Sequence, residues 1–91
     1  DAMSIKFIDL KKGDKLKTTQ MGSPVTSFLL ESPKQGRGTK SVVLVDTKGS
    51  ELGMFDECGS VYAQDVVSVY RDELWHDVTD QPESAGHDYF G

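Results

Sequence analysis

The chain has 91 residues, of which 36% are hydrophobic and 27% are charged, and its formal net charge is −5. This length allows one small domain with a thin margin of stability and excludes two domains. No apolar run approaches the roughly 20 residues of a membrane-spanning helix, so no membrane contact is expected. The single cysteine, Cys58, excludes an internal disulfide and is typical of the cytoplasm, a reducing compartment.

The two ends of the chain differ in composition from its middle. Asp1 and Ala2 precede Met3, a pattern typical of a cloning remnant followed by an initiator methionine. Residues 4–78 contain the apolar runs and are predicted to form one domain. Residues 79–91 are polar and acidic, and we expect a flexible acidic tail.

The first part of the domain predicts three short strands. Residues 4–8 partly alternate between apolar and polar side chains and predict a strand, which a lysine-rich turn with glycine follows. Residues 15–19 predict a polar edge strand, because lysines at an edge discourage pairing with other chains. Residues 25–31 alternate again and predict a third strand. Residues 32–40, rich in glycine and basic side chains, predict a mobile loop.

Residues 41–46 carry the strongest strand signal in the chain. This run, Ser-Val-Val-Leu-Val-Asp, has apolar side chains on both faces, which predicts a central strand without a fully solvated face. A second apolar run at 52–55 follows a turn that contains Gly49. Together the two runs predict a β-hairpin.

The last part of the domain predicts a turn at 56–60, a single helical turn at 61–65 and a strand at 66–70. A further strand at 74–78 returns antiparallel to it. If two residues form the loop of this hairpin, Tyr70 faces Trp75 and Val67 faces Val78.

Five to seven short strands without a long helix predict an all-β fold. Two stacked sheets would need most of their strands to be long, whereas a small, strongly bent barrel closes its sheet edges with about five short strands. A long irregular loop, a β-hairpin, one helical turn and a closing strand follow one another over about residues 15–70. This order resembles the SH3-like small barrel, which implies an antiparallel barrel architecture. The acidic-aromatic strand and the paired tryptophan of peptide-binding SH3 domains are absent, so the resemblance does not imply polyproline binding.

Charge is distributed unevenly along the chain. Residues 1–48 hold nine of the ten Lys and Arg residues and five acids, a net charge of +4. Residues 49–91 hold ten acids and Arg71 as the one cation, a net charge of −9. The sequence leaves open whether the folded molecule keeps these two halves apart.

The basic half offers a nucleic-acid interface as an alternative function. Its cations can contact a phosphodiester backbone, although the acidic half would repel one and few aromatic residues lie among the lysines in sequence. Residues 36–41 lack the spacing of a phosphate-binding loop and lead into a strand rather than a helix. The residues of this alternative are Lys11, Lys12, Lys15, Lys17, Lys34, Arg37 and Lys40.

The sequence contains no motif of an enzyme, a cofactor site or a metal site. His76 with Asp77 and Asp80 does not match a metal-ligand spacing, and solvated surface is the better interpretation. Cys58 stands beside acids rather than beside a histidine, which disfavours a nucleophilic thiolate. We therefore expect no catalysis, no cofactor and no metal.

The leading hypothesis is a non-enzymatic protein-interaction module, an inhibitor or accessory protein such as a virus-encoded regulator. Aromatic residues dominate interface energetics, and here they stand among acids in the second half of the chain, which favours a partner with a basic surface. The sequence leaves open whether Tyr70 and Trp75 belong to the core or to the contact surface. The candidate partner-binding residues are Tyr62, Tyr70, Asp72, Glu73, Trp75 and Asp77.

Overall fold

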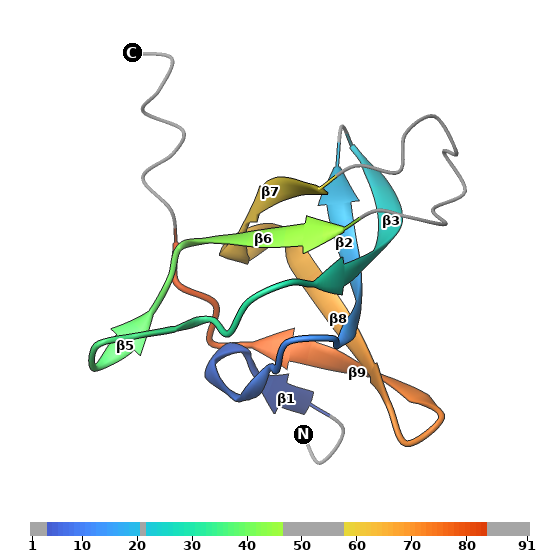
Figure 1. Cartoon of the computed structure of the whole chain (residues 1–91). Helices are drawn as coiled ribbons and strands as arrows, with labels where there is room; N and C mark the ends of the chain where they lie inside the picture. Colours follow the sequence, from blue (N-terminus) through green and yellow to red (C-terminus); the bar gives the residue numbers. More distant parts are fainter. Residues whose placement is uncertain (1–3, 21, 47–57, 84–91) are drawn as a thin grey trace.

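The computed structural model describes residues 4–20, 22–46 and 58–83, and this part of the chain contains nine strands and two 3-10 turns (Figure 1). No helix within these residues is long and apolar enough to cross a membrane. In chain order the elements are β1 (Ser4–Lys6), η1 (Phe7–Asp9), β2 (Lys15–Gln20), β3 (Ser23–Leu29), β4 (Lys34–Gln35), β5 (Gly38–Thr39), β6 (Val42–Asp46), β7 (Cys58–Tyr62), η2 (Ala63–Asp65), β8 (Val66–Arg71) and β9 (Leu74–Thr79).

Seven strands form one strongly bent sheet in the order β1-β9-β8-β2-β3-β6-β7, and β4 pairs with β5 in a separate small hairpin (Figure 1). Neighbouring strands are antiparallel except β1 and β9, which run parallel. The predicted all-β class is confirmed. The predicted barrel is not, because the sheet is not closed and β1 and β7 are its edges.

The core lies against the concave face of this sheet. Leu16 of β2 stands opposite Val69 of β8, and neither side chain is exposed. The two 3-10 turns add Phe7 and Ala63, which are also fully buried. Complete burial of a Val, Leu or Phe side chain contributes about 1.5–3 kcal/mol. The core cluster comprises Phe7, Leu10, Leu16, Leu29, Val43, Val45, Val61, Ala63, Val66, Val69 and Val78.

β2 lies inside the sheet, between β8 and β3, and the prediction of an edge strand at 15–19 is therefore wrong. Its lysines point to the outer face, while Leu16 and Thr18 are fully buried. A threonine can occupy this core position because its hydroxyl lies 3.1 Å from that of Ser27, and Gln20 Nε2 donates to both hydroxyl oxygens. A strand of alternating polar residues can therefore lie inside the sheet, because its buried hydroxyl is hydrogen-bonded and its lysines remain on the solvated face.

The predicted central strand at 41–46 is present as β6 (Val42–Asp46), between β3 and β7. Val43 and Val45 are buried, whereas Val42 and Leu44 are 38% and 46% exposed, so the outer face is partly covered and neither face is fully solvated. The predicted second strand of its hairpin, 52–55, lies outside the described residues. The predicted turn at 56–60 is corrected at its end, because Cys58 begins β7 and pairs with Asp46 of β6.

Four further segments differ from the predictions. Residues 4–8 form a strand only to Lys6, after which η1 turns Phe7 into the core. The predicted helical turn at 61–65 is present as η2, shortened to Ala63–Asp65. The loop at 32–40 contains the β4–β5 hairpin. Residues 79–83, assigned by the sequence to the tail, include the end of β9, and Gln81 Nε2 donates a 2.8 Å hydrogen bond to the carbonyl of Val66.

The predicted β8–β9 hairpin is confirmed in its register, with Tyr70 opposite Trp75 and a two-residue loop. Asp72 and Glu73 have φ angles of 53° and 65°, as a primed hairpin turn requires. The predicted facing of Val67 and Val78 is not part of the ladder, which ends with Ser68 opposite Asp77. Val67 instead lies at an irregularity between β2 and β8 and is 46% exposed.

Replacement of Glu73 by glycine should stabilise the fold. A side chain at positive φ crowds its own backbone, and glycine removes this cost, which leaves a gain of roughly 0.5–1 kcal/mol after the larger chain entropy of the unfolded state. Urea denaturation of Glu73→Gly against the parent chain measures this gain. Glu73→Ala is the matched control, since it removes the same charge and keeps Cβ. An equal gain in both variants would show that charge, rather than backbone geometry, limits this turn.

Candidate functional site

Two aromatic rings and two lysines form a continuous surface on the outer face of the sheet. We call this surface, made by Lys15, Lys17, Tyr70 and Trp75, the aromatic–lysine face. The ring centroids of Tyr70 and Trp75 are 5.2 Å apart and the rings are tilted by 60°. Lys15 Nζ lies 5.2 Å from the Tyr70 centroid, and Lys17 Nζ lies 4.7 Å from the Trp75 centroid. These separations lie in the range of cation–π attraction.

The register of three neighbouring strands creates this face. Lys15 of β2 pairs with Tyr70 of β8, and Tyr70 pairs with Trp75 of β9. On the other side of β2, Lys15 pairs with Phe28 of β3. The rings of Tyr70 and Trp75 are surface groups rather than core groups, because the residues are 39% and 37% exposed. Each lysine stem can therefore cover a ring while its ammonium group stays in water.

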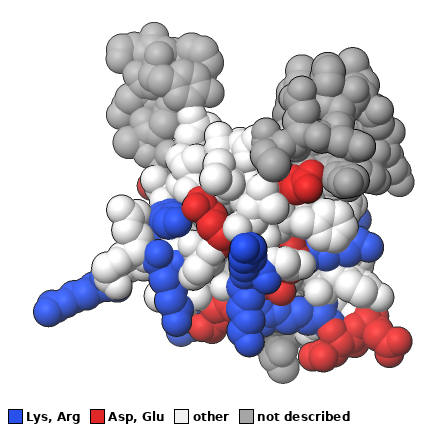
Figure 2. Space-filling view, in the orientation of Figure 1, with Lys and Arg blue, Asp and Glu red and all other residues white. Residues whose placement is uncertain are grey.

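Acidic side chains border the aromatic–lysine face. Asp72 and Glu73 form the tip of the β8–β9 hairpin, and Asp77 of β9 stands opposite Ser68, which in turn pairs with Lys17. Figure 2 shows acids gathered at the hairpin tip, apart from most of the lysines and arginines visible on this side. Three acids against two lysines give this surface a slight excess of negative charge.

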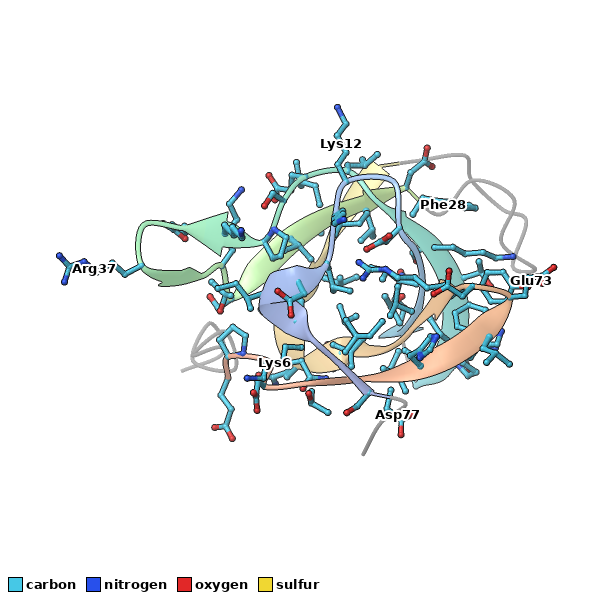
Figure 3. All side chains as sticks on the ribbon, turned by 90° about the horizontal axis from the view of Figure 1, so that it is seen from below. Lys6, Lys12, Phe28, Arg37, Glu73 and Asp77 are labelled. Atoms are coloured by element: carbon cyan, nitrogen blue, oxygen red, sulfur yellow. The ribbon has the colours of Figure 1, made fainter. Side chains whose placement is uncertain are left out.

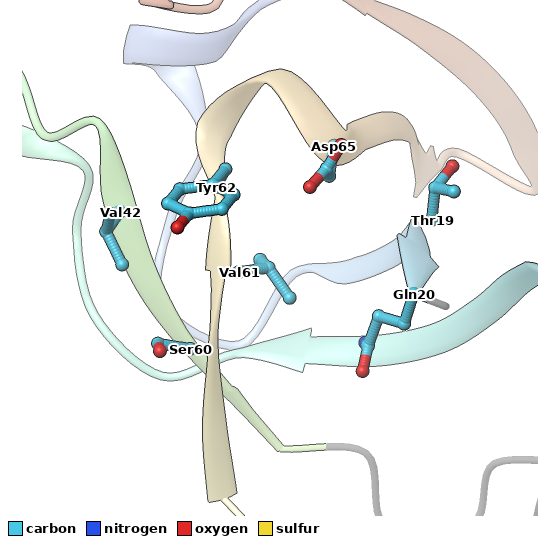
Figure 4. Close-up of a pocket in the computed structure, with 7 residues that line it drawn as sticks. All are labelled: Thr19, Gln20, Val42, Ser60, Val61, Tyr62 and Asp65. Atoms are coloured by element: carbon cyan, nitrogen blue, oxygen red, sulfur yellow. The ribbon is translucent and has the colours of Figure 1, made fainter. Parts of the chain in front are cut away.

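Tyr62 is not part of this surface. It lies on β7, at the opposite end of the strand order from β9, and pairs with Val42. Both residues line an open pocket of about 500 Å³ between the β7 edge and the end of β2 (Figure 4). Of the six predicted partner-binding residues, the fold brings Tyr70, Asp72, Glu73, Trp75 and Asp77 to one hairpin and places Tyr62 elsewhere.

A second open pocket, of about 550 Å³, lies where η1 and the turn after it approach β4 and the end of β8. We call it the basic pocket. The ammonium groups of its lysines have no ion-pair partner among the described residues. Its residues are Ile8, Asp9, Leu10, Lys11, Lys12, Ser32, Lys34 and Arg71.

Arg71 shapes one wall of the basic pocket. Its Nη2 donates to Asp14 Oδ2 at 2.6 Å and to the carbonyl oxygen of Asp9 at 2.9 Å. Asp14 Oδ2 also accepts a 2.7 Å hydrogen bond from the backbone of Lys11. These hydrogen bonds connect the end of β8 to the turn that carries Lys11 and Lys12. The sequence did not indicate Arg71, because its partner Asp14 is 57 residues away in the chain.

The seven cations of the nucleic-acid alternative occupy different places. Lys11, Lys12 and Lys34 line the basic pocket, whereas Lys15 and Lys17 cover aromatic rings. Arg37 lies in the β4–β5 hairpin and points away from the body of the molecule (Figure 3). Lys40 forms a 3.0 Å ion pair with Glu31. Few aromatic residues lie among the lysines in sequence, but strand pairing brings Tyr70 and Trp75 to the lysines of β2 in space.

Among the described residues, no group of three or more His, Cys, Asp and Glu side chains could hold a metal ion. His76 Nε2 lies 3.0 Å from the carbonyl oxygen of Arg71, a contact that ties it to the β8–β9 hairpin. Its neighbour Asp77 lies on the outer face of the sheet, opposite Ser68. The sequence drew attention to these residues through their proximity in the chain. In the fold, His76 contacts the backbone of the β8–β9 hairpin and Asp77 belongs to the acidic border of the aromatic–lysine face.

Comparisons with protein-family models, with curated proteins and with solved structures found no match to this chain.

The Lys40–Glu31 pair can be tested by titration. The hydrogen bond from Lys40 holds the pKa of Glu31 below its ordinary value of 4.5, and the backbone N–H of Leu44 lowers the pKa further, against partial burial. Lys40→Gln should therefore raise the pKa of Glu31, as carboxyl-carbon NMR measures. The folded pKa is the lower one, so this pair's contribution to stability is present above pH 4.5 and is lost as pH falls through the folded value. An unchanged Glu31 titration in Lys40→Gln would show that Lys40 is not its dominant partner.

Proposed function

We propose that this protein is a non-enzymatic module that binds another protein through the aromatic–lysine face and its acidic border, and so acts as an inhibitor or accessory subunit. The observation that carries the proposal is the exposed pair of rings, Tyr70 and Trp75, held against each other and against two lysines. Tyrosine and tryptophan are the residue types that most often dominate binding energy at protein interfaces.

The order of β2, β3, β6, β7, η2 and β8 supports an SH3-like arrangement as part of this proposal. After the single helical turn η2, β8 closes back onto β2, the first strand of this set. The long segment between β3 and β6 contains the β4–β5 hairpin. It takes the place of the long irregular loop in the strand order of the SH3-like barrel. The edge strands β1 and β7 do not pair with each other, so the sheet is not a closed barrel. The likeness to the SH3-like fold therefore extends only to the order of the strands.

The side chains of Tyr70 and Trp75 are preorganised for binding. Tyr70 and Trp75 stand opposite each other in the ladder, so their backbones are fixed. Each ring also has a lysine ammonium nearby, which narrows its range of positions. Less side-chain freedom is then lost on association, and more of the contact energy remains as affinity.

The charges around the rings favour a protein partner over a nucleic acid at this surface. Asp72 and Glu73 at the hairpin tip and Asp77 on β9 border the aromatic–lysine face and would repel phosphates that approach the rings. A protein partner with an apolar patch and basic side chains around it complements both the rings and the acids. Such complementarity mainly raises the association rate and fixes the orientation of the complex.

The test compares three forms of the protein in affinity capture from lysate of the source cells. Tyr70→Ala/Trp75→Ala should reduce the amount of captured partner protein more than tenfold, because truncation of interface anchors commonly costs about 2 kcal/mol or more. Leu44→Ala is the control, since it truncates another exposed apolar residue, on β6, outside the aromatic–lysine face. It should capture as much partner as the parent chain. Mass spectrometry quantifies each eluate.

Trp75 is the single tryptophan of the chain, so its fluorescence reports directly on the proposed surface. Addition of the purified partner should shift its emission, because the ring loses contact with water on binding. The proposal fails if the double variant captures the same proteins as the parent chain. It also fails if the partner binds at full affinity without any change in Trp75 emission.

A further inference from the structure

We infer that the basic pocket is a second, independent binding surface, which takes the phosphodiester backbone of a nucleic-acid strand. Lys11 and Lys12 in the turn after η1, together with Lys34 of β4, line one open pocket of about 550 Å³. These lysines belong to segments more than twenty residues apart in the chain, and the fold brings them together. None of them has an ion-pair partner among the described residues.

The local charge of the pocket is opposite in sign to the charge of the whole chain. The pocket is lined by four cations and one acid, Asp9, and with Asp14, the ion-pair partner of Arg71, the local net charge is +2 in a chain of net charge −5. Arg71 is already paired with Asp14, so the lysines carry the free positive charge. Figure 2 shows lysine and arginine side chains gathered over the lower part of this side, next to the β4–β5 hairpin.

The lining of the pocket favours phosphate over other anionic groups. Lysine ammonium groups are compact point charges with three donors each, and they bind phosphate oxygens without demanding one geometry. The hydroxyl of Ser32 accepts a 3.2 Å hydrogen bond from the backbone of Lys34, which leaves its own proton to donate to an anion. This hydrogen bond holds Ser32 next to Lys34, and both residues line the basic pocket.

The openness of the pocket favours a strand over a small phosphorylated molecule. Its lining, as far as the described residues form it, consists of charged, aliphatic and hydroxyl side chains without an aromatic ring, which favours contacts to phosphate over stacking with a base. Beyond the pocket, Arg37 extends from the β4–β5 hairpin, and Lys12 also points away from the body of the molecule (Figure 3). A chain of phosphates can therefore pass along the pocket toward the hairpin. Contacts to the backbone alone imply binding that does not depend on base sequence.

The test measures binding of a short fluorescent DNA duplex by anisotropy between about 50 and 200 mM salt. Three lysine contacts predict a slope of log affinity against log salt near −2.7, since each neutralised phosphate contributes about −0.9. Lys12→Gln/Lys34→Gln should flatten the slope by roughly 1.8 and should weaken binding equally for unrelated DNA sequences. Lys15→Gln/Lys17→Gln removes the same charge from β2 and should leave the slope unchanged.

Three outcomes would overturn the inference. Absence of binding at the lowest salt, or equal losses in both double variants, would show that no phosphate site exists at the basic pocket. Competition by inorganic pyrophosphate at the same phosphate concentration as the duplex would assign the pocket to a small anion instead of a strand. The outcome is independent of the protein-binding proposal, because Lys12→Gln/Lys34→Gln leaves Tyr70 and Trp75 in place, and capture of a partner protein by this variant should be unchanged.

Discussion

The pairing of β2 with β8 is the contact on which the rest of the structure depends. It joins a strand from the basic half of the chain to a strand from the acidic half, and it places Leu16 opposite Val69 in the core. The same pairing aligns Lys15 with Tyr70 on the outer face. It also brings Arg71, at the end of β8, to Asp14, which precedes β2. Core, aromatic–lysine face and basic pocket therefore share one structural cause.

This pairing also decides how charge is distributed over the molecule. The two halves of opposite charge do not form two separate sides, since β2 lies between β8 and β3 in the sheet. Basic side chains instead gather at the turn after η1 and along β4 and β5, while acids gather at the β8–β9 tip. The two proposed surfaces consequently differ in chemistry. One offers rings bordered by acids, and the other offers ammonium groups, with no ring among its described lining residues.

Local pattern was sufficient where neighbouring segments pair with each other. The register of Tyr70 and Trp75 followed from a two-residue loop, because the loop length of a hairpin fixes which residues face each other. It was insufficient where strands distant in the chain pair. The lysines of β2 suggested an edge strand, yet β8 covers one side of it and β3 the other. For β6, apolar composition indicated a strand without a fully solvated face, but only the fold decided that Val43 and Val45 face the core while Val42 and Leu44 are partly exposed.

The sequence by itself determined the all-β class, most of the strands, the single turn of helix before β8 and the hairpin that carries both rings, because each depends on residues close together in the chain. Only the tertiary structure decided that lysines from β2 cover those rings, that Tyr62 stands apart from them, and that Lys34 joins Lys11 and Lys12 around one pocket. These placements follow from sheet order and from the bending of the sheet. Both are set by the burial of one shared core, which no short stretch of sequence specifies alone.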